Sequence, residues 1–130
     1  MGEKAIEVIL TRQWASYLAT PIFIVDAAGT LVYYNEPAER VLGLRYEDTG
    51  EMSQERWGNL FNQEDDDGNP LPAGALPLAQ ALRDRRPAHG AFWIRGLDGQ
   101  RRRIAVTAFP LIGQANRNLG ALAVFWEAPA

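Results

Sequence analysis

The segment TPIFIVDAAGTLVYYNEPAERVLG, residues 20–43, constrains the fold more than any other part of the chain. Its runs at 22–26 and 31–35 are rich in β-branched and aromatic residues, and the AAGT between them is typical of a tight turn. Asn35 is well suited to cap a helix, and Gly43 is suited to end one. Residues 20–43 therefore predict a β-hairpin that leads directly into a short helix.

Further elements are expected on both sides of this segment. Ahead of it, apolar residues at three- and four-residue spacings predict an amphipathic helix over residues 3–18, which Pro21 ends. Beyond it, helical segments are predicted at residues 51–62 and 75–87, and strands at residues 91–96, 101–112 and 120–127. Strands and helices do not alternate, so the order predicts an α+β fold with helices packed on one face of an antiparallel sheet.

The last predicted strand, residues 120–127, is apolar on both faces. One face carries Leu122, Val124 and Trp126, and the other carries Ala121, Ala123 and Phe125. An antiparallel sheet with one face in water is expected to alternate polar and apolar residues. We therefore expect the second face to be covered, and helix 3–18, from the same chain or from a partner, is the candidate cover. Ordinary, partly exposed surface is the alternative.

Composition narrows the functional classes. The chain has 130 residues and a mass of 14.4 kDa, which suits one domain. It contains no cysteine, which excludes disulfides, thiolate catalysis, cysteinyl-flavin chemistry and cysteine-ligated metals. The N-terminus lacks the apolar core of a signal peptide, and no apolar run approaches the about 20 residues of a membrane span. Because the net charge is −3, we expect a soluble cytoplasmic domain that binds neither nucleic acid nor membrane.

Together, these residues and the order of elements resemble a PAS domain of the bacterial sensor and interaction type. The resemblance covers residues 20–127 and rests on PIFIVDAAGTLVYYNEPAERVLGL, DDDGNPLPAGALPLAQALRDRRP, GLDGQRRRIAVTAFPLI and GALAVFWE. Residues 1–19 are similar to the N-terminal flanking helix of such domains, and residues 128–130 form a tail. The resemblance implies a five-stranded antiparallel sheet with a helical flank that encloses a small cavity. It also implies a sensory or interaction role, commonly in a dimer that signals through flanking helices.

The first functional hypothesis is a non-catalytic sensory module that binds a small apolar or amphipathic molecule in this cavity. Residues expected at the cavity are Val25, Leu42, Trp57, Leu60, Leu82, Val106 and Val124. Asn35 is expected to be a structural cap. The signal is expected to pass through helix 3–18 and the sheet face. Because no output segment follows FWEAPA, we expect the module to act on a partner in trans or to be a piece of a longer protein.

The second hypothesis is a ligand-free interaction module with a filled interior. Such a module forms a homodimer, or receives an effector protein, through helix 3–18 and the sheet face. The expected contact residues are Ile6, Leu10, Trp14, Tyr17 and Phe125.

The identity of any cofactor stays open. Without cysteine, the chain lacks the reactive residue of the flavin photosensor members. Haem-binding members usually place an axial histidine on or near the long helix, whereas His89, the only histidine, follows Pro87 at the start of a strand. Non-covalent flavin is the other alternative, since Trp57, Trp93 and Trp126 suit an aromatic cavity, although such residues are more commonly plain core.

Three further features have an ordinary interpretation. EDDDGNP, residues 64–70, lacks the bidentate glutamate of a calcium loop and reads as a solvated acidic turn, so no metal site is predicted. Arginines at 95 and 101–103 predict a polar sheet edge or a salt-bridged partner surface. Asp26 is the candidate base of a small-cavity enzyme, the third functional class. Because Asp26 opens a turn, where aspartate commonly caps its own backbone, no catalytic residue is predicted.

Overall fold

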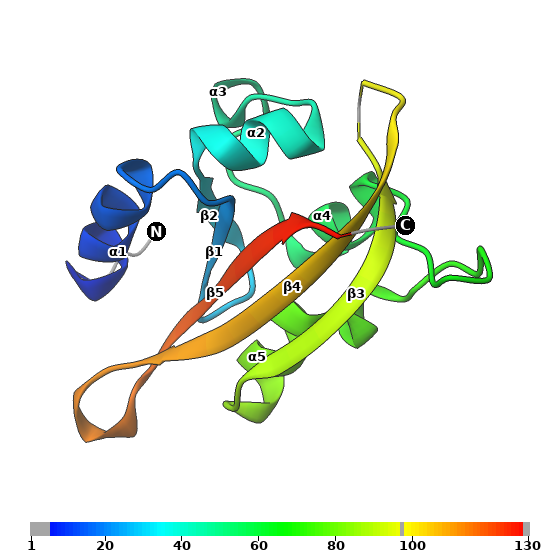
Figure 1. The fold of residues 1–130 in the computed structure, drawn as a ribbon. Coiled ribbons are helices and arrows are strands. Elements are labelled where there is room, and N and C mark those ends of the chain that lie inside the picture. The colour runs from blue at the N-terminus through cyan, green and yellow to red at the C-terminus, as the bar shows by residue number, and fades with distance from the viewer. Residues whose placement is uncertain (1–5, 97, 129–130) are drawn as a thin grey trace.

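Five antiparallel strands form one sheet in the computed structural model, which describes residues 6–96 and 98–128 (Figure 1). The strands are β1 (Ile22–Asp26), β2 (Leu31–Tyr34), β3 (Ala88–Arg95), β4 (Arg101–Ile112) and β5 (Asn118–Glu127), in the spatial order β2-β1-β5-β4-β3. The helices are α1 (Ile6–Ser16), α2 (Glu36–Leu42), α3 (Tyr46–Thr49), α4 (Gln54–Leu60) and α5 (Pro77–Asp84), with 3-10 turns η1 (Ala73–Ala75) and η2 (Gln114–Asn116). The predicted α+β fold is confirmed. Residues 1–5 of the expected flanking helix and 129–130 of the expected tail lie outside the described residues.

The hairpin turn between β1 and β2 is held by one carboxylate. Asp26 Oδ1 accepts hydrogen bonds of 3.0 Å from the backbone N–H groups of Ala28 and Thr30. Gly29 takes a φ of +86°, which glycine adopts without the steric cost of a Cβ. Local chemistry alone therefore explains why this segment turns where the sequence predicts.

Asn35 connects four segments at the start of α2. Its Oδ1 accepts from the backbone N–H of Ala38 at 3.2 Å, which is the N-cap bond, and from that of Ile22 at 3.0 Å. Its Nδ2 donates to the backbone carbonyls of Ala15 at 3.0 Å and Thr20 at 2.9 Å. The side chain is fully buried, so these bonds satisfy backbone groups that water does not reach.

The sheet carries an apolar core on each face. The helices α2, α4 and α5 bury one face, and α1 packs on the other, where it contacts β1 and β5 (Figure 1). In β5, Ala121, Ala123 and Phe125 belong to the first core, whereas Leu122 and Val124 belong to the second. The helix from the same chain thus covers part of the second face.

Small side chains, not large ones, bring α1 onto the sheet. Val8 and Ala15 are buried there. The large apolar residues at helical spacing point away, with exposed fractions of 67% for Ile6, 56% for Leu10, 52% for Trp14 and 88% for Tyr17. Positions 8 and 15 are two helical turns apart and share a face, while the large residues occupy another. We call Ile6, Leu10, Trp14 and Tyr17 the α1 stripe.

Several elements start at other residues than predicted, and for two of them, α5 and β3, the cause is clear. The helix expected at 75–87 starts at Pro77, because Leu76 precedes a proline and is held extended with ψ of 144°. The strand expected at 91–96 starts at Ala88, because the register of β3 on β4 continues through His89. Backbone pairing with the long strand β4 thus extends β3 over residues 88–90, although the sequence of these residues shows no strand pattern.

Candidate functional site: an apolar pocket and an exposed helix face

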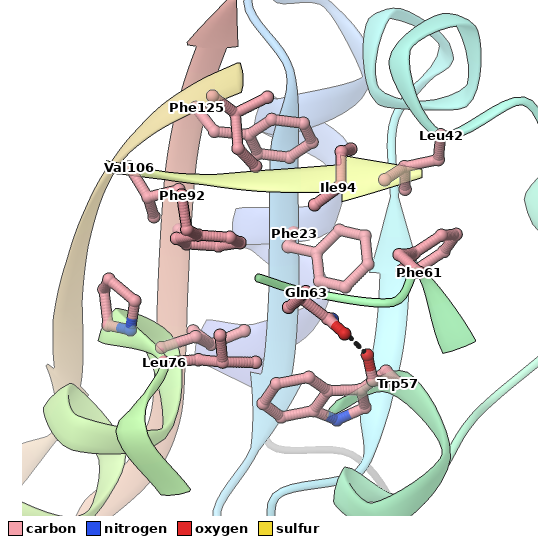
Figure 2. Close-up of a pocket in the computed structure, with 14 residues that line it drawn as sticks. Phe23, Leu42, Trp57, Phe61, Gln63, Leu76, Phe92, Ile94, Val106 and Phe125 are labelled. Atoms are coloured by element: carbon pink, nitrogen blue, oxygen red, sulfur yellow. Dashed lines mark hydrogen bonds between the residues drawn. The ribbon is translucent and has the colours of Figure 1, made fainter. Parts of the chain in front are cut away.

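An apolar pocket of about 60 Å³ lies between the helical flank and the sheet (Figure 2). We call it the helix–sheet pocket. Its lining residues are Phe23, Leu42, Trp57, Phe61, Gln63, Leu76, Pro77, Leu78, Phe92, Ile94, Ile104, Val106, Ala123 and Phe125. They come from β1, α2, α4, α5, the three C-terminal strands and the segment between α4 and α5, so the pocket exists only in the assembled fold.

Aromatic rings form much of the pocket wall. The ring of Phe23 packs edge-on against Phe125, with ring centres 6.0 Å apart. Tyr34 stacks on the same Phe23 ring, with ring centres 5.2 Å apart. Trp57 Nε1 donates to the backbone carbonyl of Gly29 at 2.9 Å. This bond ties α4 to the hairpin turn and leaves the indole without an unmet donor.

Gln63 is the one polar side chain in the lining, and it is 6% exposed. Its Nε2 donates to the backbone carbonyl of Trp57 at 2.9 Å, which Figure 2 shows as a dashed line. Its Oε1 has no donor within the protein, and no other buried side-chain oxygen or nitrogen of residues 6–96 and 98–128 lacks a partner. The lining is therefore hydrocarbon apart from the Gln63 amide, whose oxygen has no hydrogen-bond partner in the protein.

A second candidate surface lies on the opposite side of the sheet. The α1 stripe borders a groove of about 320 Å³, and the groove is lined by Leu10, Thr11, Trp14, Phe109, Leu111 and Leu122. Leu10 and Trp14 thus belong both to the exposed ridge and to the wall of the groove. A ridge beside a groove on one surface is the arrangement that a self-complementary contact requires.

A family model described as "PAS domain" matches residues 19–127. The chain belongs to the PAS domain family. PAS domains are typical sensory and regulatory modules of signalling proteins and are generally not catalytic. No curated protein matches the chain.

Solved structures with the same fold include three from bacteria. The PAS domain of Bordetella pertussis BvgS is 13% identical with a TM-score of 0.64, and the match covers 95% of this chain and 87% of that one. The PAS domain of nitrogen regulation protein NR(II) from Vibrio parahaemolyticus is 20% identical with a TM-score of 0.62, and the match covers 92% of this chain and 98% of that one. The Rhodobacter sphaeroides LOV protein is 18% identical with a TM-score of 0.69, and the match covers 95% of this chain and 67% of that one. Likeness at these identities shows the PAS fold alone.

The PAS core holds most of the predicted cavity residues, but only some line the pocket. Leu42, Trp57 and Val106 are in its wall. Val25 is buried in the same core without lining the pocket, and Leu60 and Leu82 pack against that core half-exposed. Helical and strand periodicity identified residues of the correct core. It did not indicate which of these core residues line the helix–sheet pocket.

The face assignment in β5 is wrong for two residues. Val124, predicted at the cavity, belongs to the α1 side of the sheet. Phe125, predicted on the partner surface, is buried in the pocket wall. The two are neighbours in a strand, so one must lie on each face. Because both faces of β5 are apolar, the alternation shows that neighbouring residues lie on opposite faces. It does not show which of the two faces lies against α2, α4 and α5.

Several pocket residues were missed at the sequence level. Phe23 alternates with Ile22 and Ile24 in a strand that is apolar from residue 22 to residue 25, so the sequence does not indicate which face Phe23 occupies. Phe92 and Ile94 alternate with Trp93, and this pattern identifies one face of β3. Gln63 was missed because a glutamine in a loop resembles surface, and only the fold buries it.

The cofactor alternatives do not fit the pocket. Flavin and haem need several hundred Å³, within the range of about 300–1,000 Å³ for ligand pockets, and the space here is about 60 Å³. His89 is exposed and does not line the pocket, and its Nδ1 lies 3.2 Å from Thr107 Oγ1. Of the expected aromatic set, Trp57 lines the pocket, whereas Trp126 is 47% exposed and Trp93 stacks under Arg101 outside it.

The arginine-rich sheet edge is paired within the chain. Arg103 contacts Asp66 at 3.2 Å, and Arg102 contacts Asp98 at 3.0 Å. Hydrogen bonds from Arg103 and Trp93 lower the pKa of Asp66, and a hydrogen bond from Arg102 does the same for Asp98. These contacts occupy the basic edge with acidic groups of the same domain.

Other chemical alternatives find no support in the geometry. The carboxylate of Asp26 caps its own turn and does not line the helix–sheet pocket, so it is not placed as a buried base.

In the acidic turn, Asp65 Oδ1 accepts from the backbone N–H groups of Asp67 and Asn69, both at 2.9 Å. Within the described residues there is no cluster of three or more histidine, aspartate or glutamate side chains suited to a metal ion. None of the helices in that part of the chain has the length and apolar character of a bilayer span.

Proposed function

We propose that this PAS domain is a non-catalytic sensory module that takes up a small, largely apolar molecule in the helix–sheet pocket. The observation that carries the proposal is the lining, which is hydrocarbon except for one buried, unpartnered amide oxygen. Natural ligand sites combine mostly apolar walls with a small number of polar groups that orient the ligand. The output surface in this proposal is α1 with the adjoining sheet face.

Two physical connections support coupling between the pocket and α1. Ala123 and Phe125 line the pocket while the intervening Val124 packs on the α1 side, so displacement of β5 acts on both cores. The second connection runs through α2, because Leu42 lines the pocket at one end and the Asn35 cap bonds Ala15 of α1 at the other. Packed interiors transmit small displacements because they contain few voids.

Native mass spectrometry of the protein as purified, with an absorption spectrum of the same sample, tests uptake. The proposal expects an additional mass of a small, colourless compound, or its appearance after incubation with metabolite mixtures. Backbone amide shifts in an NMR spectrum then test coupling, since occupancy is expected to shift signals in α1 as well as in β5. Occupancy that leaves every α1 signal unchanged would contradict the sensory role while leaving binding intact.

A second candidate function is self-association through the α1 stripe. It is favoured by the exposure of four large apolar residues beside the groove at Phe109 and Leu122. Burying such side chains gains roughly 25 cal/mol for each Å² of apolar surface. A second copy is the proposed occupant, because a two-fold contact sets the ridge of each copy against the groove of the other, and an effector protein is the alternative. The two functions are compatible if ligand uptake changes the exposure of the stripe.

A further inference from the structure

The orientation of the Gln63 amide is fixed by its neighbour. The group next to its Nε2 is the backbone carbonyl of Trp57, which is an acceptor only. Rotating the amide by half a turn would set oxygen against oxygen and lose the 2.9 Å hydrogen bond. The unpartnered atom is therefore the oxygen, and the pocket offers an acceptor and no donor.

An acceptor buried at this depth favours a partner with a proton to donate. Leaving a buried polar group without a hydrogen bond is unfavourable, and a ligand that meets it gains more than it would on an exposed surface. The other lining residues offer no charge and no polar side-chain atom free to bond, so a charged ligand would lose its hydration without compensation.

The volume limits the size of the ligand. A pocket of about 60 Å³ exceeds the roughly 10–15 Å³ that one water needs and is smaller than the about 150 Å³ of an engineered cavity that binds benzene. It suits about two to three non-hydrogen atoms, which is the size of methanol or ethanol.

We propose that the helix–sheet pocket selects small neutral molecules that carry a single hydroxyl or N–H donor, and that Gln63 Oε1 is the group that selects them. This rests on the proposed function and names its ligand class. An apolar molecule without a donor fits the same walls but leaves Oε1 unmet.

Ethanol and dimethyl ether form a matched pair for the test, because they are isomers with three non-hydrogen atoms each and only ethanol carries an O–H donor. Each compound is titrated into the full chain, and the indole N–H signal of Trp57 is followed by NMR. Trp14, Trp93 and Trp126 do not line the pocket and serve as internal references. The wild-type protein is expected to bind ethanol about tenfold more tightly than dimethyl ether.

Variants assign the preference to Gln63. Gln63→Leu removes the acceptor at similar size and is expected to bring the two affinities within about twofold of each other. Gln80→Leu is the control, since Gln80 also donates Nε2 to a backbone carbonyl, at 2.8 Å, but lies outside the pocket. It is expected to keep the tenfold preference. If Gln63→Leu does not fold, Gln63→Met supplies the same loss of acceptor on a flexible chain.

The outcomes separate this proposal from the proposed function. Equal binding of both compounds at Trp57 of the wild-type protein overturns selection by Gln63, while uptake into the pocket stands; this is also the result if a permanently held water satisfies Oε1. An ethanol preference that survives both Gln63 variants overturns the assignment to that residue. If neither compound shifts the Trp57 signal, both the ligand class and uptake of small molecules by the pocket are wrong.

Discussion

The side-chain amide of Asn35 donates a hydrogen bond of 3.0 Å to the backbone carbonyl of Ala15, which joins the end of α1 to the start of α2. The same side chain also donates to Thr20 and accepts from Ile22 and Ala38, all from a fully buried position. Asn35 is thus the cap that the sequence predicts and, in addition, the polar joint of the N-terminal region.

Replacing Asn35 is expected to destabilise the fold strongly. Asn35→Ala leaves several buried backbone groups unpaired and should lower the free energy of unfolding by about 2–4 kcal/mol. Asn35→Asp keeps the cap acceptor but sets a carboxylate against two carbonyl oxygens, so it should cost at least as much at neutral pH. Urea denaturation followed by circular dichroism measures both. An aspartate variant as stable as the wild type would show that the two donated bonds contribute nothing.

Filling the pocket is expected to be tolerated where filling the neighbouring core is not. Ala123→Val points two added carbons into the pocket and should raise the free energy of unfolding by about 1 kcal/mol. Ala121→Val is the control, because Ala121 is fully buried in the same core without lining the pocket. Overpacking there should cost about 1–3 kcal/mol.

Thermal and urea unfolding of the two alanine variants give the comparison, and the ethanol titration gives a second readout. Ala123→Val should weaken ethanol binding because it occupies the space. Equal destabilisation by both substitutions would mean that the pocket closes in solution.

A charge on the α1 stripe is expected to weaken the proposed self-association without unfolding the monomer. Trp14 is 52% exposed, so Trp14→Glu removes apolar surface and adds a charge at the proposed contact while leaving the core intact. Sedimentation equilibrium should show at least a tenfold weaker dimer. Gln13→Glu adds the same charge at an exposed position outside the stripe and should leave association unchanged. Identical behaviour of the two variants would exclude the stripe as the contact.

The fold was predictable where local chemistry and periodicity agree. The Asp26 turn, the Asn35 cap and the long strand β4 each follow from residues adjacent in sequence. The site was predictable only in part, because its definition depends on long-range packing. Phe125 and Val124 show why the face of a residue could not be predicted here. They lie on opposite faces of β5, and because both faces are apolar the sequence pattern is the same for each. Gln63 shows another, because burial of a loop glutamine is decided by strands and helices distant in the chain.

Alkaline pH is expected to destabilise the domain through Tyr34. Burial raises the pKa of this phenol from its ordinary value of 10.0, and its hydroxyl donates to the backbone carbonyl of Leu44 at 2.8 Å. Because the folded pKa is the higher one, the contribution to stability is complete below pH 10.0 and is lost as the pH rises through the folded pKa.

Urea midpoints measured from neutral to strongly alkaline pH test this. Tyr34→Phe should lower stability by about 1 kcal/mol at neutral pH and make the alkaline decline shallower. Burial also raises the pKa of Tyr33, so part of the decline should persist and should diminish further in the double variant. A decline of unchanged slope in Tyr34→Phe would place its origin elsewhere.

Alternation along β5 gives the domain two separately mutable sets of residues on one strand. Residues 123 and 125 line the pocket, and residues 122 and 124 pack on the α1 side, with only the shared backbone in common. Under the proposed function, evolution can therefore change the signal that such a domain detects while conserving the partner that it addresses, or the reverse. A chimaera that exchanges only one of these sets between PAS domains should inherit one property and keep the other.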